Sequence, residues 1–438
     1  MGHLKLKYGL DELPSIVDLI FLGLQWFVIT VPTVIIMGNV VAGLHFTNPV
    51  GQTIYIQKIF FVTGVSFLIQ LLWGHRLPLV MGPSTILLVG ITVSRSSSIS
   101  AIYTAVAIGG LVLFIISAAG LFNKLKSLFT APVVATILIL VAFTLTPTIS
   151  NLITSSSAPE LALSNISFAL IFVLCIFAVN RCVSGFWKST LIMWALIAGI
   201  VVYLLLFPES FAVAQVADTG IIAGFFSNMN LNWSIDPGVI IAFLICFLAL
   251  SINDLGSIYS VGGMLKPDNM SKRVSRGLSW TGILNFFSGL LGTIGPVNFS
   301  MSPGVIVSTG CASRFSLIPA GVILVSMSFM PAVIALMGAI PQVVVGGILL
   351  YIMCSQLAAG LSMVTQSEKG FNFEKGLVIG FPLMLSIIIS FLPNSVLDTF
   401  PAVLRPILGN GFVVGVLVVL IMEHLIFKKK DGSQQAKE

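Results

Sequence analysis

The chain has 438 residues, of which 57% are hydrophobic and only 8% are charged, and its formal net charge is +6. A soluble domain could not bury this much apolar surface, so the composition predicts a polytopic membrane protein. The basic residues are scattered through loops rather than striped along one element, which argues against a nucleic-acid partner.

Fourteen apolar segments follow one another along the chain between polar breaks. They lack the alternation of a β-barrel, so all are expected to be helices. They begin near Ile16, Tyr55, Leu77, Ile99, Val133, Ile166, Ser189, Val239, Gly277, Val297, Phe315, Val343, Gly376 and Val403. With the amino terminus in the cytoplasm, all but three of the 21 basic residues fall in inside loops, the exceptions being Lys58, Arg95 and Arg405. This asymmetry follows the positive-inside rule and predicts a cell-membrane protein with both termini cytoplasmic.

These segments predict a single transporter domain, with a first half at 1–235, a second half at 236–427 and a cytoplasmic tail at 428–438. The first residues lack a short apolar core and a small-residue cleavage site, so no removable signal peptide is expected. The five cysteines are odd in number and lie mostly in apolar runs, so neither a disulfide framework, a metal site nor another cofactor is predicted.

Two segments are too short and too broken to be ordinary spans. One passes through Pro78, Gly82 and Pro83, and the other through Pro296 and Pro303. In each, an extended piece leads to a proline at which a helix can start, because proline suits the first helical turn. Such a half-helix points unpaired N–H groups into the protein at membrane depth.

The two breaks are spaced like a duplication. Pro83 and Pro303 are 220 residues apart, and related strings follow Pro132 and Pro341. Because seven segments per half is an odd number, the second half enters the membrane from the opposite face. The pattern therefore predicts an inverted repeat, the usual transporter plan.

One acidic residue, Asp254, lies in the middle of an apolar segment that runs from residue 237 to residue 265. A carboxyl group at that depth costs about 2.5 to 3.5 kcal/mol and usually faces a cavity, a partner or a pathway. We interpret it as part of a substrate or ion site. The alternative is a protonated Asp that is hydrogen-bonded between packed helices.

Substrate binds near the midplane in such folds, where broken helices of the two halves face each other. The candidate lining residues are Gly82, Pro83, Ser84, Thr85, Asn298, Phe299, Ser300, Met301, Ser302, Gly304, Asn253, Asp254, Gln25 and Trp26. They offer donors, acceptors, an aromatic face and one carboxylate, but no cation, which suits a neutral, flat, hydrogen-bonding solute. Interhelical packing is an equal reading for Gln25 and Trp26, and helix capping is the alternative for Ser84 and Ser302.

Several strings resemble the nucleobase-ascorbate transporters, also called the second nucleobase-cation symporter family. They are Gln25 in a first segment, residues 75–82, the eighth-segment string that ends at Gly256, and residues 404–411. Gly304, Thr309 and Gly310 also fit the spacing of the family signature in the tenth segment. The resemblance covers essentially the whole chain and is greatest to a divergent bacterial branch of purine or uracil and xanthine permeases.

The resemblance implies a fourteen-helix fold of two inverted repeats. Helices one to four and eight to eleven would form a core, and helices five to seven and twelve to fourteen would form a gate. Movement of core against gate would expose the site alternately to each side. It also implies nucleobase uptake coupled to proton or, less often, sodium entry, with an acidic residue of helix eight binding the base.

The chain also departs from the family. Aligned through Gly256, the family's helix-eight Glu falls on Asn253, one residue before Asp254. Met301 and Ser302 stand in place of the signature Gln or Glu and Asn, and Thr281 stands where many members carry an Asp. Trp26 replaces the His of a helix-one Gln-His pair. Carboxylates that relatives use for binding or coupling are therefore missing, and the exact base does not carry over.

We hypothesise that Asp254, or Asn253 with Asp254 behind it, accepts hydrogen bonds from the ring N–H groups of a purine or pyrimidine. Backbone at residues 82–84 and 302–304 would take the other edge of the base. A change of protonation at Asp254 during transport would couple uptake to protons.

Two alternatives to coupled nucleobase transport stay open from the sequence: uncoupled uptake, and anion transport by the same fold, which predicts basic lining residues. The sequence also leaves open whether the protein forms a homodimer through its gate helices. Because a nucleophile paired with a base, or a metal-binding spacing, is lacking, an enzyme is not expected.

Overall fold

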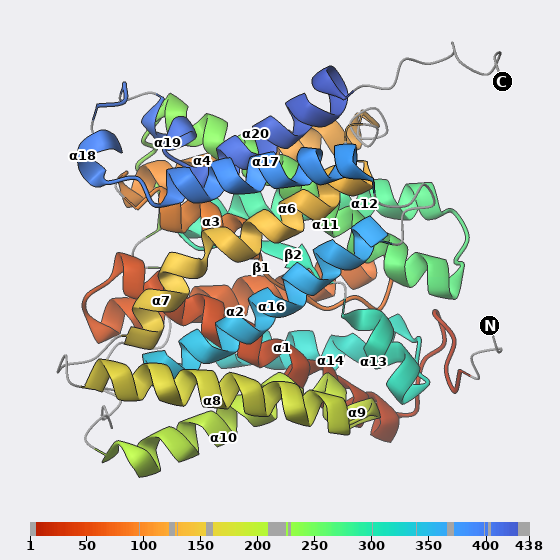
Figure 1. Ribbon diagram of the computed structural model, residues 1–438. Coiled ribbons are helices and arrows are strands. Elements are labelled where there is room, and N and C mark those ends of the chain that lie inside the picture. The colour runs from red at the N-terminus through yellow and green to blue at the C-terminus, as the bar shows by residue number, and fades with distance from the viewer. Residues whose placement is uncertain are drawn as a thin grey trace.

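The protein is built of helices around two three-residue strands, as the computed structural model shows (Figure 1). The structure describes residues 6–95, 97–121, 128, 130–154, 161–208, 225–226, 229–299, 301–338, 340–365, 372–397, 399–401 and 404–427. The strands are β1 (Met81–Pro83) and β2 (Pro296–Asn298), and they lie in the middle of the bundle.

One group of helices packs closely around these strands. Within it α12 packs on α4, α14 packs on α2, and α1 packs on both α2 and α14. Its helices are α1 (Ile16–His45), α2 (Pro49–Leu72), α3 (Thr85–Val93), α4 (Ile99–Ala118), α11 (Pro237–Leu265), α12 (Met270–Leu291), α13 (Ser302–Thr309), η2 (Arg314–Leu317), α14 (Ile318–Ser328) and α15 (Pro331–Gly338).

Small residues bring α4 and α12 together. A Cβ placed on Gly282 would lie 2.5 Å from the backbone nitrogen of Phe114, and one on Gly110 would lie 2.5 Å from the backbone nitrogen of Phe286. In a membrane, where lipid is as apolar as leucine, such close backbone approach is a main source of helix–helix attraction.

A second group of helices lies outside the first. In this group α16 packs on α6, α7 and α8, and α17 packs on α6 and α20. Its helices are α6 (Ala131–Thr144), α7 (Thr146–Thr154), α8 (Leu161–Cys182), α9 (Gly185–Ser189), α10 (Leu191–Leu206), α16 (Gln342–Thr365), α17 (Phe373–Ser390), α18 (Asn394–Leu397), α19 (Arg405–Leu408), α20 (Gly411–Ile421) and the π-helix η3 (Met422–Ile426). In Figure 1, α8, α9 and α10 lie at the bottom edge, and α17 and α20 lie at the top.

Many of the helices are apolar enough to cross a membrane. Among the described residues, eight helices have the length and composition of a span, and the pair formed by Arg314–Ser328 and Pro331–Met337, bent by 99°, would make a ninth. Two further apolar helices, Leu191–Leu206 and Gly411–Ile426, are shorter. The prediction of a mostly helical membrane protein is therefore confirmed.

The two predicted breaks are each a short strand followed by a short helix, β1 with α3 and β2 with α13. Lys58, which the charge pattern places on the outside, lies inside α2 with only 2% of its surface exposed, and its Nζ donates to the carbonyl oxygen of Leu291 at 2.9 Å. Its charge is thus paired with a backbone carbonyl at a helix end rather than presented in a loop.

Candidate functional site

The two broken segments meet through their strands. β1 and β2 are antiparallel, with Met81 opposite Asn298 and Pro83 opposite Pro296. Two flanking bonds extend the ladder, from Ser84 N to the oxygen of Gly295 at 3.0 Å and from Phe299 N to the oxygen of Val80 at 2.8 Å. Since each strand leads directly into a short helix, the pairing brings the amino-terminal ends of α3 and α13 to the same region of the protein.

Two serines at these helix starts have different tasks. Ser84 caps α3, because its Oγ accepts from the backbone N–H of Leu87 at 3.3 Å. Ser302 does not cap α13, whose N-cap residue is Met301. Its Oγ instead accepts from Val80 N at 2.9 Å, which ties α13 to the chain before β1. Capping therefore describes Ser84 and is wrong for Ser302.

A cavity of about 750 Å³ lies where the ends of α3 and α13 face the second group of helices. From the strand side its walls are Thr33, Met37, Thr85, Asn253, Phe299, Met301, Pro303, Gly304, Val305 and Val307. From α8, α9, α10 and α16 they are Asn180, Gly185, Lys188, Leu191, Ile192, Tyr351, Ile352, Ser355, Gln356 and Ala359. This volume suits a small organic molecule.

The structure divides the predicted residues into two sets. Asn253, Phe299, Met301 and Gly304 line the cavity. Gly82, Pro83, Ser84 and Ser302 are buried in the strands and helix starts that support it. Ser300 lies outside the described residues.

Asp254 is fully buried and belongs to the support rather than to the cavity wall. Its Oδ1 accepts from the backbone nitrogen of Asn298 at 3.0 Å and from Asn298 Nδ2 at 2.6 Å. Its Oδ2 accepts from Thr281 Oγ1 at 2.7 Å. Adjacent helical positions differ by about 100°, so while Asn253 faces the cavity the carboxylate of Asp254 points toward β2 and α12.

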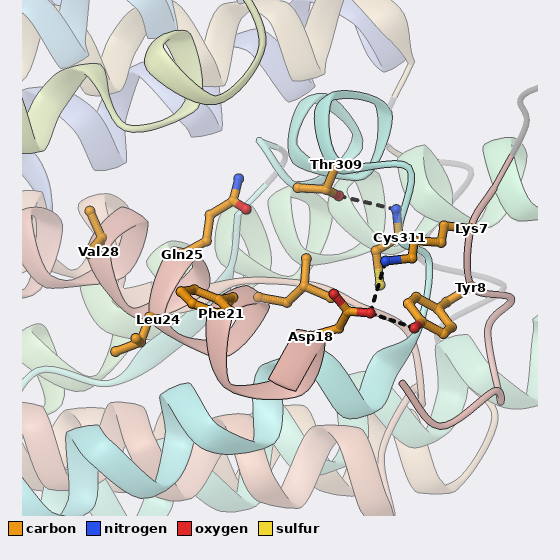
Figure 2. Close-up of a pocket in the computed structure, with 10 residues that line it drawn as sticks. Lys7, Tyr8, Asp18, Phe21, Leu24, Gln25, Val28, Thr309 and Cys311 are labelled. Carbon is orange, nitrogen blue, oxygen red and sulfur yellow. Dashed lines mark hydrogen bonds and ion pairs between the residues drawn. The ribbon is translucent and has the colours of Figure 1, made fainter. Parts of the chain in front are cut away.

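Gln25 lines a different cavity, of about 400 Å³, between α1 and the end of α13 (Figure 2). On its far side Lys7 Nζ and the Tyr8 hydroxyl both donate to Asp18 Oδ2, at 2.9 and 2.6 Å. The bond to Asp18 raises the pKa of the exposed Lys7 ammonium above its ordinary value. Among the residues that the structure describes, Gln25 Nε2 is buried and has no hydrogen-bond partner.

Trp26 is 1% exposed, and its Nε1 donates to Ser316 Oγ at 2.9 Å. This contact joins α1 to η2, the 3-10 helix before α14. Trp26 therefore packs between helices and does not line either cavity.

The sequence interpretation missed the outer wall of the cavity. Lys188, Tyr351 and Gln356 come from α9 and α16, far from the broken segments in the sequence. Lys188 is the one charged side chain among the described residues of the lining. For Tyr351 and Gln356 the only sequence signal is polarity within an apolar segment, and for Lys188 it is a basic residue in an inside loop. Neither signal says which helix the side chain faces.

Comparisons with known proteins agree with this architecture. The family model Xan_ur_permease, described as a permease family, matches residues 17–395. A uric acid permease of Bacillus subtilis, PucJ, is 26% identical to the chain over 396 residues, covering 87% of each protein. The xanthine permease of the same organism is 24% identical, covering 91% of this chain and 93% of its own.

Two solved structures share the fold. The transmembrane domain of the cyanobacterial bicarbonate transporter BicA superposes with a TM-score of 0.61 at 15% identity, covering 87% of this chain and 98% of that one. Murine Slc26a9, an anion transporter in the inward-facing state, gives 0.62 at 12% identity, covering 94% and 69%. At these identities the likeness shows the fold alone. The match of the family model along most of the chain shows that this protein is a permease and not an enzyme, and that it belongs to the nucleobase-ascorbate transporter family.

Proposed function

We propose that the protein is a secondary active transporter that carries a nucleobase, a purine such as xanthine or a pyrimidine such as uracil, across the cell membrane. The observation that carries this proposal is the cavity itself. It combines an amide at Asn253, an aromatic face at Phe299 and the amino-terminal end of α13 in a volume of about 750 Å³. A flat base with ring N–H groups and carbonyls fits that set of partners.

Asn253 and the helix ends would share the recognition of the base. The amide of Asn253 both donates and accepts, so it can pair with a ring N–H and a neighbouring carbonyl. Phe299 and Tyr351 offer aromatic surfaces, and the amino-terminal end of α13 offers the positive end of a helix dipole. Backbone at residues 82–84 and 302–304 would act mainly by shaping these ends.

The protein would work with fourteen membrane segments in two inverted repeats of 1–235 and 236–427. The antiparallel pairing of β1 with β2 and the matching strand–helix order of the two breaks support this plan. Both termini, including the tail 428–438, would be cytoplasmic, as the positive-inside rule predicts.

The two packing groups would be the core and the gate of an alternating-access mechanism. The core is the group around the strands, and the gate is the group that contains α6, α8, α10, α16, α17 and α20. The cavity lies between residues of both, and α9 contacts α13 across the boundary. Relative movement would therefore open and close the cavity wall. A homodimer would form through gate helices.

Proton entry would drive accumulation through Asp254, with sodium as the less favoured ion. Asp254 does not line the cavity but bonds to Asn298, the residue before Phe299. Protonation would remove one acceptor site on the carboxylate and so loosen β2 next to the bound base. An uncoupled facilitator is the alternative.

Anion transport is the second candidate, and Lys188 is the observation that favours it, since a cation lines the cavity. Uptake of labelled uracil, xanthine, hypoxanthine, guanine and urate, with and without a protonophore, tests both proposals. We expect uptake of at least one base that falls with the protonophore. Anion exchange without uptake of any base would reject nucleobase transport.

A further inference from the structure

Asp254 belongs to a closed ring of buried side chains with Gln70, His75, Thr281 and Asn298. Gln70 Nε2 lies 3.1 Å from Thr281 Oγ1, which lies 2.7 Å from Asp254 Oδ2. Asn298 Nδ2 lies 2.6 Å from Asp254 Oδ1, and Asn298 Oδ1 lies 3.1 Å from His75 Nε2. The ring closes where the backbone N–H of His75 donates to Gln70 Oε1 at 3.2 Å. All five residues are at most 1% exposed.

The direction of the bonds on the His75 side follows from a backbone group. The N–H of Leu77 can only donate, and it donates to His75 Nδ1 at 3.0 Å. His75 Nδ1 is therefore unprotonated, and the imidazole hydrogen sits on Nε2. It donates to Asn298 Oδ1, so the amide nitrogen of Asn298 must face Asp254.

The other side of the ring is fixed in the same way. The carbonyl of Gly277 can only accept, and Gln70 Nε2 donates to it at 2.8 Å. The same nitrogen donates to Thr281 Oγ1, which leaves the Thr281 hydrogen for Asp254. Three donors thus point at the carboxylate of Asp254, two from Asn298 and one from Thr281.

The turn that carries His75 contains a strained backbone conformation at the next residue, Arg76. Arg76 has a φ of +55°, which a residue with a Cβ seldom adopts. Its backbone N–H donates to the oxygen of Gln70 at 3.1 Å. Arg273 Nη1 donates to the carbonyls of both His75 and Arg76, at 3.2 and 2.9 Å. Several contacts thus hold His75 in one orientation.

We propose that His75 is a positioning residue for the transport site, a role that rests on the proposed function. Its imidazole holds Asn298 Oδ1, so that Asn298 Nδ2 faces Asp254 on the same side as the backbone nitrogen of Asn298. Asn298 is further held by Ser257 Oγ, which donates to its carbonyl at 2.9 Å, and it is followed directly by Phe299 of the cavity wall. Without the imidazole donor, Asn298 Oδ1 loses its His75 partner in a buried site, so the side chain shifts and moves β2 and with it Phe299.

Two substitutions separate positioning from other roles. His75→Gln keeps an acceptor for Leu77 and a neutral donor for Asn298, whereas His75→Leu removes both. We expect the Michaelis constant for the transported base to stay within about twofold of wild type in His75→Gln and to rise about tenfold in His75→Leu, the effect of one hydrogen bond. His424→Leu is the matched control, because its Nε2 bonds to the carbonyl of Leu128, outside the ring.

The measurement is initial-rate uptake of labelled xanthine, uracil and urate, normalised to folded protein, with the melting temperature of each purified variant. A raised Michaelis constant in His75→Leu, absent from His75→Gln, supports the proposal, since a purely structural defect lowers only the amount of active protein. A wild-type value in His75→Leu, or an equal rise in His75→Gln, overturns it. If His75→Leu does not purify, His75→Phe, which also lacks the donor and the acceptor, takes its place in the comparison. If the wild type transports no base, the proposed function is rejected. The role of His75 in holding the hydrogen-bonded ring is then tested by the melting temperature, which should drop in His75→Leu and not in His75→Gln.

Discussion

Asn253 and Asp254 are consecutive residues of α11, yet Asn253 lines the cavity while the carboxylate of Asp254 is bonded to Asn298 and Thr281 behind it. The rotation of about 100° between adjacent helical positions places the two side chains on different sides of α11. We propose that Asn253 binds the base and that Asp254 holds β2, the strand that supports the cavity wall, through its bonds to Asn298.

Replacing Asp254 by Asn should abolish accumulation of base against a gradient and leave counterflow exchange in place. The amide puts a donor where three donors already point, so we also expect a loss of about 1 to 3 kcal/mol of stability. Proteoliposomes with an imposed proton gradient measure the accumulation. Asp236→Asn is the control, because Asn caps the start of α11 as well as Asp does. Undiminished accumulation in Asp254→Asn would rule out proton coupling through this residue.

Asn253→Ala should raise the Michaelis constant for the base about tenfold, because one or two hydrogen bonds to the base are lost. The melting temperature should not change, since the side chain lines a cavity rather than a packed core. Ser260→Ala on the same helix is the control, as its hydroxyl bonds the carbonyl of Ser257 within α11. Equal uptake kinetics in both variants would remove Asn253 from the site.

Lys188→Gln tests whether the cavity serves a neutral solute or an anion. If the substrate is a neutral base, its Michaelis constant should stay within about twofold of wild type, because an exposed charge contributes little to binding an uncharged molecule. The kinetics of uracil and of a small inorganic anion should be compared in both proteins. A loss of anion transport in the variant, with no uracil uptake in the wild type, would favour the anion transporter.

Gly282→Leu should destabilise the protein by at least about 1 to 3 kcal/mol, because the new leucine side chain would meet the backbone of α4. Gly263→Leu on α11 is the control, since a Cβ there meets nothing within 4 Å. Thermal unfolding of the two purified variants measures the difference. Equal melting temperatures would mean that α4 and α12 are not packed backbone to backbone.

The local features of the site could be predicted from the sequence because proline, glycine and serine mark a broken helix wherever it lies. The strands and short helices at residues 81–93 and 296–309 confirm that interpretation. Helical periodicity alone could not show which of Asn253 and Asp254 faces the cavity, since both lie in an apolar run.

Contacts between segments that are distant in the sequence could not be predicted from it. The pairing of β1 with β2, the approach of Lys188 and Tyr351 to the cavity, and the bond from His75 to Asn298 join residues from opposite halves of the chain. No local pattern encodes such pairs. The hydrogen bond from the Thr281 hydroxyl to Asp254 gives a structural role to a threonine that the family resemblance alone does not explain.

We propose that this protein moves a nucleobase through the cavity beside Asn253. Counterflow in proteoliposomes of purified protein, loaded with unlabelled xanthine or uracil, tests it most directly because it needs no coupling ion. We predict transient accumulation of the labelled base, strongly reduced in Asn253→Ala at low substrate concentration. An absence of counterflow for every purine and pyrimidine tried, in protein that melts cooperatively, would contradict the claim.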